Sequence, residues 1–81
     1  MKIHSSHDLA AYVTTHRQEQ KLTQTILADR VGLKQSTVSA FENKPDSTRL
    51  DTLFRILSAS GLELQVVKKD QTQSQNLVED W

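Results

Sequence analysis

The chain has 81 residues, enough for one small domain and little more, and its ten basic and ten acidic residues give a net charge of zero. It has no cysteine, which excludes a disulfide framework and a thiolate metal site. It also has no apolar run as long as a signal peptide or membrane span, so we expect a cytoplasmic protein with no membrane partner.

A first helix is predicted from Ser5 to about Gln20. Ser5 and Asp8 have the spacing of a capping box, in which the first side chain caps the helix and the second supports its first turn. The apolar residues that follow have helical spacing and define one inner face: Leu9, Ala10 and Val13.

Residues 23–42 have the pattern of a helix-turn-helix motif. Thr23 is a good N-cap, and Leu27 and Val31 share one helical face around the small Ala28. Gly32 follows directly, where a left-handed residue would end the helix. We therefore predict two short helices that cross at a tight turn.

The second helix of this motif has an apolar side and a polar side. Leu33, Val38 and Phe41 are predicted to face the core. Amide and hydroxyl side chains of little bulk can enter a major groove and hydrogen-bond to base edges, and a lysine can reach guanine. The candidate base contacts are Lys34, Gln35, Ser36 and Ser39.

Five further residues are candidate phosphate contacts. Gln24 opens the first helix of the motif, where free backbone amides favour an anion. Thr37 lies within the second helix of the motif, Asn43 and Lys44 where that helix ends, and Arg49 at the start of the next helix. The alternative for Thr37 is contact with a thymine methyl, and for the other side chains it is simple solvation.

A fourth helix is predicted after a loop at residues 43–47, which holds the only proline. Thr48 with Asp51 has the spacing of another cap, and Gly61 is suited to end the helix. The predicted inner face consists of Leu50, Leu53, Phe54 and Leu57.

Residues 62–68 change to the two-residue repeat of a strand. Leu62, Leu64 and Val66 fall on one face, and polar residues alternate with them. Because a lone strand leaves its backbone unpaired, we expect it to pair with its copy in a homodimer. The alternative is pairing with residues 1–4 of the same chain.

Residues 69–81 are predicted to be a flexible acidic tail, because they are too polar to fold alone. Its one large apolar group is Trp81, the only tryptophan of the chain. Tryptophan often anchors an interface, so Trp81 is a candidate partner contact. The alternative is an exposed aromatic at a frayed end.

The neutral total hides an uneven charge distribution. Residues 1–61 carry eight basic and six acidic side chains, whereas residues 62–81 carry two basic and four acidic ones. A slightly basic head argues only weakly for nucleic acid, so binding would depend on well-placed contacts.

Catalysis and metal binding find no support in the sequence. His4, His7 and His16 have no neighbouring carboxylate set with zinc spacing, and two glycines leave little material for a phosphate-binding loop. We therefore expect no enzyme activity, no cofactor and no metal.

The motif resembles the XRE family, the Cro and phage-repressor class of helix-turn-helix proteins. The matching positions are Gln24, Ala28, Gly32 and Glu42. The resemblance implies an ion pair between Arg17 and Glu42 that ties the first helix to the end of the third. It also implies a dimeric repressor that reads a near-palindromic operator with half-sites roughly 34 Å apart.

A narrower resemblance is to the HipB-like antitoxins of this family. It rests on residues 32–39, 41–43 and 45–46 and on the final tryptophan. It implies repression of the chain's own operon, restraint of a HipA-like serine/threonine kinase toxin, and a toxin-anchoring role for Trp81. The alternatives are a plain regulator without a toxin and a protein-interaction module on the same fold.

The sequence thus predicts three parts. Residues 1–61 form a mostly α, four-helix DNA-binding domain, residues 62–68 a dimerising strand, and residues 69–81 a tail.

Overall fold

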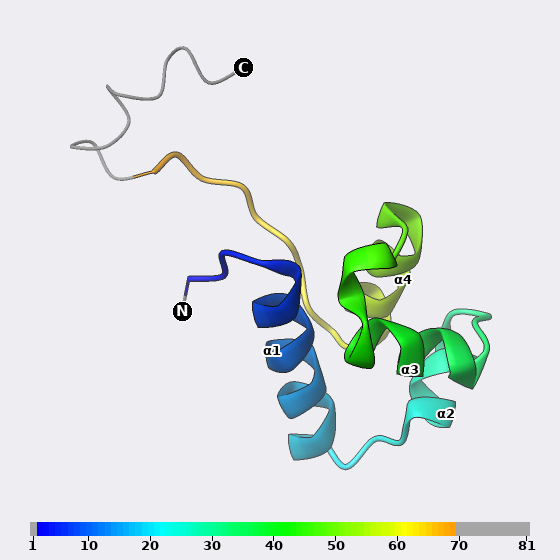
Figure 1. Cartoon of the computed structure of the whole chain (residues 1–81). Helices are drawn as coiled ribbons and strands as arrows, with labels where there is room; N and C mark the ends of the chain where they lie inside the picture. Colours follow the sequence, from blue (N-terminus) through cyan, green and yellow to red (C-terminus); the bar gives the residue numbers. More distant parts are fainter. Residues whose placement is uncertain (1, 70–81) are drawn as a thin grey trace.

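The computed structural model describes residues 2–69 and consists of four helices (Figure 1). The α-helices are joined by short loops, and a single 3₁₀ turn, η1, precedes the last of them. The elements in chain order are α1 (Ser6–Glu19), α2 (Gln24–Arg30), α3 (Gln35–Asn43), η1 (Pro45–Ser47) and α4 (Leu50–Ala59).

Side chains cap the first two helices at the residues that the sequence predicts. The Ser5 hydroxyl accepts the backbone N–H of Asp8, and the Thr23 hydroxyl accepts that of Ile26, each at 3.0 Å. Both predicted N-caps are therefore confirmed, and α1 ends at Glu19, with Gln20 as its C-cap.

Three of the four helices end in the same left-handed turn. The residue after each C-cap has a positive φ, and the next N–H bonds back to a carbonyl of the last helical turn, which is the Schellman motif. The predicted Gly32 (φ 68°) and Gly61 (φ 73°) occupy two of these positions, and Lys21 (φ 59°) occupies the third. The closing bonds are Leu22 N to Arg17 O at 3.1 Å, Leu33 N to Ala28 O at 3.0 Å and Leu62 N to Leu57 O at 2.9 Å.

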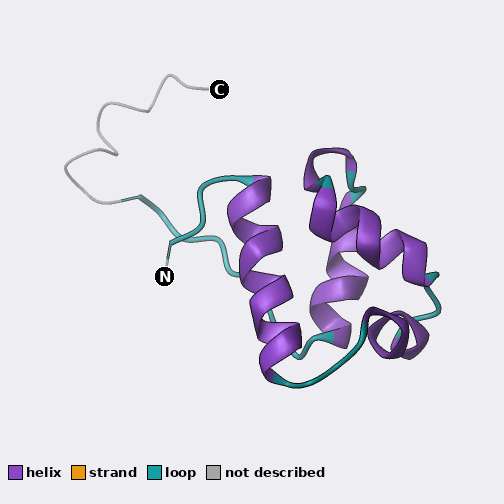
Figure 2. Ribbon diagram, turned by 60° about the horizontal axis from the view of Figure 1, so that its bottom comes forward, coloured by secondary structure: helices purple, strands orange, loops and turns teal. Residues whose placement is uncertain are grey.

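The core is one cluster to which every α-helix contributes. Figure 2 shows how these helices are arranged. Phe41 and Leu27 are its largest fully buried side chains, and α2 and α3 pack closely across it. The buried apolar residues are Ala10, Val13, Leu27, Ala28, Val38, Phe41, Ile56, Leu57 and Ala59.

The predicted inner face of α4 is wrong in part. Leu50 and Phe54 are 68% and 51% exposed, whereas Ile56 is fully buried together with the predicted Leu57. Apolar residues cover an arc of α4 that is wider than its contact with the core, so periodicity alone does not define which edge is buried. The outer edge of this arc faces solvent in the single chain.

The connection before α4 also differs from the prediction. Residues 43–47 are not a plain loop, because Asn43 ends α3 and Pro45 opens the 3₁₀ turn. Thr48 is the C-cap of η1, where its N–H donates to the Pro45 carbonyl at 3.0 Å, and it is not the N-cap of α4. The N-cap is Arg49, which makes no side-chain capping bond.

A polar contact ties η1 to the start of α1. The Ser6 hydroxyl donates to the Asp46 carboxylate, and the His7 Nε2 lies 3.5 Å from it. These two neighbours, the Ser6 hydrogen bond first and then the His7 charge, lower the pKa of Asp46 below its ordinary value.

Residues 62–69 are extended but belong to no sheet within the described chain. No backbone hydrogen bond joins them to residues 2–4, so the pairing within one chain is not formed in the described region. Leu64 is 45% exposed and Val66 92% exposed. Pairing with a second copy stays a prediction, as does the division into a head, strand and tail.

Within residues 2–69, no helix has the length and apolar character that a bilayer crossing requires.

Candidate nucleic-acid interface

The outer face of α3 is polar and free of bulky side chains. Val38 and Phe41 are buried, which turns the opposite side of the helix outward. The predicted base contacts Lys34, Gln35 and Ser36 are exposed, and Ser39 is half-buried beside them. Lys34 is the N-cap and makes no side-chain capping bond, so the first amides of α3 are open to an acceptor.

Behind this face, Arg17 and Glu42 form a two-point ion pair between α1 and α3. Arg17 Nε donates to Glu42 Oε2 at 2.7 Å, and Arg17 Nη2 donates to Oε1 at 3.1 Å. The guanidinium also donates to the Leu22 carbonyl at 2.7 Å. Their side chains are only 12% and 7% exposed, so each charge depends on the other for compensation.

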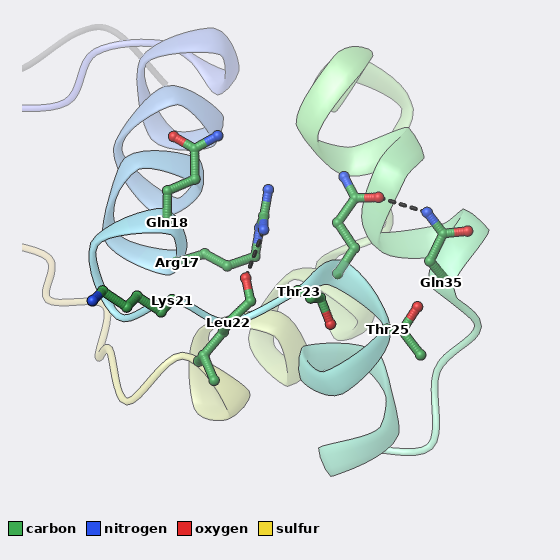
Figure 3. Close-up of a pocket in the computed structure, with 8 residues that line it drawn as sticks. Arg17, Gln18, Lys21, Leu22, Thr23, Thr25 and Gln35 are labelled. Carbon is green, nitrogen blue, oxygen red and sulfur yellow. Dashed lines mark hydrogen bonds between the residues drawn. The ribbon is translucent and has the colours of Figure 1, made fainter.

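The hydrogen bonds continue from this ion pair to the outer face. Gln24 Nε2 donates to Glu42 Oε1 at 2.8 Å. Gln35 Nε2 donates in turn to Gln24 Oε1 at 2.6 Å, the dashed line that ends at Gln35 in Figure 3. One network therefore runs from the end of α1 through the start of α2 to the first residue of α3. It orients the side chain of Gln35 in the absence of DNA.

This network changes what the two glutamines can offer to DNA. Gln24 uses its oxygen and one N–H inside the protein, and one N–H remains for the predicted phosphate contact. Gln35 uses one N–H, and its oxygen and second N–H remain open. One donor beside one acceptor is the pattern that complements adenine N7 and N6 in the major groove.

A hollow of about 540 Å³ lies between the end of α1 and the starts of α2 and α3 (Figure 3). Seven of its eight lining residues have polar side chains, and both glutamines of the network are among them. Sequence reasoning missed three polar residues there, Gln18, Lys21 and Thr25. Thr25 follows Gln24 in the same helical turn, which was the available signal, whereas nothing in the pattern marks Lys21 as a helix-ending residue.

Of the remaining phosphate candidates, Asn43 and Lys44 lie at the other end of α3, Thr37 is its third residue, and Arg49 is the N-cap of α4. Asn43 and Lys44 are exposed, and Asn43 Nδ2 donates to Ser39 Oγ at 3.2 Å. Thr37 is half-buried. Arg49 lies 3.4 Å from the Asp51 carboxylate, and both side chains are largely exposed, so solvent screens this pair.

Other candidate residues lie away from this face or outside the described chain. In the stretch 2–69, no three histidine, cysteine or carboxylate side chains converge in a way that suits a metal. His16 instead contacts the Ser60 carbonyl. Leu62 is half-buried against the core, Leu64 and Val66 belong to the extended segment, and Trp81 lies outside the described residues.

The chain is similar to known proteins in both sequence and structure. The chain matches a helix-turn-helix family, HTH_3, over residues 15–67. It is 40% identical to the antitoxin HipB of Escherichia coli strain K12 over 81 aligned residues, which cover 94% of this chain and 92% of that protein.

Solved structures agree with the sequence match. A HipB–O4 20-mer complex superposes with a TM-score of 0.84 at 40% identity, and the alignment covers 86% of this chain and 99% of that one. A HipA–HipB–O2–O3 complex matches with the same TM-score, identity and coverage.

Proposed function

Because this chain belongs to the HTH_3 family of helix-turn-helix proteins and is a relative of the HipB antitoxins, we propose that it is the DNA-binding antitoxin of a toxin–antitoxin pair. In this role it represses its own operator and restrains a HipA-like serine/threonine kinase. The family consists of non-enzymatic regulators, and we assign no catalytic step to the chain. Its site of action is the cytoplasm, where operator DNA is found.

The observation that carries this proposal is the preset polar face of α3. A recognition helix binds tightly when its side chains already hold the orientation that the bases require, because less conformational entropy is lost on binding. The bonds from Glu42 through Gln24 supply that orientation to Gln35. Lys34, Ser36 and Ser39 complete the face that we assign to base contacts.

Phosphate contacts would position this face in the groove. The remaining N–H of Gln24 lies at one end of the interface, and Asn43, Lys44 and Arg49 lie at the other end. Thr37, the third residue of α3, lies in its first turn with Gln35. Such contacts fix the register of the protein on DNA without reading its sequence.

A homodimer would present two copies of α3 to a near-palindromic operator. Residues 63–69 make no backbone hydrogen bond within the described chain, which leaves a full set of donors and acceptors for a partner strand. Leu62, Leu64 and Val66 would supply the apolar face of that strand. The exposed Leu50 and Phe54 of α4 add apolar surface that a second copy can cover.

The kinase partner is supported by the relative that has been solved together with HipA. We assign the anchor of that contact to Trp81, which would occupy an apolar pocket of the partner. Truncation before Leu77 tests this assignment: kinase affinity should fall while operator affinity stays the same. Unchanged kinase affinity would remove the anchor from the proposal.

Operator recognition is tested by the double variant Gln35→Ala, Ser39→Ala in gel shifts of the DNA upstream of the chain's own coding sequence. Each good base contact contributes about 1–3 kcal/mol, so specific affinity should fall by at least tenfold, roughly, while the dimer persists. The matched control is Thr15→Ala, an exposed residue of α1. Normal binding by the double variant would contradict the recognition role of α3.

The gene neighbourhood separates the antitoxin from a plain regulator of the same fold. A kinase-like reading frame beside this one supports the antitoxin, and its absence favours the plain regulator. A protein-interaction module that has lost DNA binding would give no shift with any upstream DNA at low salt, where electrostatic binding is strongest.

A further inference from the structure

The carboxyl end of α4 has all four of its terminal carbonyl groups hydrogen-bonded. The Leu57 and Ser58 carbonyls accept the N–H groups of Leu62 and Gly61 at 2.9 and 3.1 Å, as expected for a Schellman motif. That motif leaves the carbonyls of Ala59 and Ser60 without a backbone donor. Ala59 and Ser60 are 6% and 2% exposed, so little water can reach them.

Side chains from two other helices bind these two carbonyls. Arg30, the last residue of α2, donates from Nη1 to the Ala59 carbonyl at 3.0 Å. His16 of α1 places Nε2 3.0 Å from the Ser60 carbonyl. Because a carbonyl only accepts, this nitrogen carries the proton in the contact. The positive charge of Arg30 also lies at the negative end of the α4 dipole, which is a favourable interaction.

The imidazole of His16 is held in place by its neighbours on α1. Tyr12 stacks on it with ring centroids 6.4 Å apart and planes inclined by 6°. The side-chain nitrogen of Gln20 lies 2.9 Å from the same Nε2. His16 is therefore oriented from two sides.

These contacts lie at the end of the helical domain, directly before residues 62–69. Ser60 and Gly61 form the turn from which residues 62–69 extend, and Arg30 belongs to the helix that packs directly against α3. The direction of the dimer-forming segment is thus tied by one hydrogen bond to α2 and by another to α1. Both bonds therefore connect the start of residues 62–69, the proposed dimerisation arm, to the helical domain.

We propose that His16 and Arg30 are positioning residues that set the spacing between the two operator half-sites. The inference rests on the proposed function, in which a dimer reads two half-sites about one helical turn apart. Each added base pair moves a half-site by about 3.4 Å and rotates it by roughly a tenth of a turn. A dimer tolerates such a shift only if each chain can bend at Ser60 and Gly61, between its helical domain and residues 62–69.

The experiment compares the double variant His16→Ala, Arg30→Ala with the wild-type chain on a series of duplexes. Each duplex carries two copies of the half-site that footprinting of the upstream DNA defines, with the spacer changed one base pair at a time. The matched control is Thr15→Ala, Asp29→Ala, which changes exposed neighbours on the same two helices.

We expect wild type and control to prefer one spacer strongly. In the double variant, the ratio of dissociation constants between a one-base-pair shift and the optimum should fall about fivefold or more, the factor associated with one net hydrogen bond. Affinity for a single half-site should not change. The conservative variants His16→Gln and Arg30→Lys keep a donor at each position and should restore part of the preference.

A purely structural role would lower the affinity equally at every spacer, and that result would overturn the inference. An unchanged spacer preference in the double variant would overturn it as well. If the double variant does not fold, Arg30→Gln alone decides the question by the same ratio. Failure of the wild type to bind any spacer would instead reject the proposed function, and this inference with it.

Discussion

Two regions of the molecule differ in how their polar and apolar groups are satisfied. The first is the polar network around α2 and α3, and the second is the outer face of α4 together with residues 62–69. In the first region, Arg17, Glu42, Gln24 and Gln35 satisfy one another within a single chain. In the second region, the backbone from residue 63 onward makes no backbone hydrogen bond within the described chain, and apolar side chains face solvent. The hydrogen bonds of the first region are complete within one chain, whereas we propose that residues 62–69 find their backbone partners in a second copy.

Removal of residues 63–81 should have the largest effect, because it deletes the extended segment and leaves the helices. Leu62 remains to close α4, so the head keeps its fold while the dimer is lost. Two linked half-site contacts then become independent, and operator affinity should fall roughly a hundredfold or more. Sedimentation velocity and gel shifts measure the two effects. A persistent dimer would show that another surface forms the interface.

Two phenylalanines provide a matched test of burial in the two regions. Phe41 is 2% exposed in the core, so Phe41→Ala should cost about 3–5 kcal/mol of unfolding free energy. Phe54 is 51% exposed, so Phe54→Ala should leave the unfolding of the monomer nearly unchanged and weaken the dimer. Urea unfolding in the 1–62 background isolates the monomer, and equal costs would contradict the comparison.

The two arginine–carboxylate pairs sharpen the contrast further. Glu42→Ala strands the mostly buried Arg17 without a partner and should cost about 3 kcal/mol, with a loss of operator specificity through Gln24. Asp51→Ala breaks the exposed pair with Arg49 and should cost less than about 1 kcal/mol. Chemical denaturation of both variants distinguishes them, and similar costs would show that burial of the first pair has no energetic weight.

Acid titration should give the smallest effect. Asp46 has its pKa lowered by Ser6 and His7, so its contacts stabilise the fold above the ordinary carboxylate range, and this contribution is lost as pH falls through the lowered pKa. Asp46→Asn should therefore make the thermal midpoint fall less steeply between about pH 5 and 2. A slope identical to that of the wild type would mean that this exposed contact does not stabilise the fold.

Local signals in the sequence were sufficient for the head of the molecule. The caps at Ser5 and Thr23 and the left-handed glycines at 32 and 61 depend on residues within a few positions, and all four are confirmed. The family resemblance is confirmed by the match over residues 15–67. The candidate base contacts could be named because helical spacing alone separates the inner from the outer face of a short helix.

The sequence predictions were wrong where the local pattern allows more than one structure. Thr48 is a residue type that often caps helices, but here it ends η1, and Arg49 is the N-cap of α4. Leu50 and Phe54 have the spacing of core residues, but the core contacts the opposite edge of α4. Propensity describes what a residue can do locally, and packing decides which option is realised.

The amino-acid sequence by itself determined the four helices, the N-caps Ser5 and Thr23, the glycine turns at 32 and 61, and the polar character of α3, because these follow from contacts within one turn or one helical face. Only the tertiary structure decided that Gln35 is held through Gln24 to Glu42, and that Arg30 and His16 close the end of α4. These partners are separated by 11 to 44 positions along the chain. Their meeting depends on how the helices cross, which packing of the whole core fixes and no local pattern encodes.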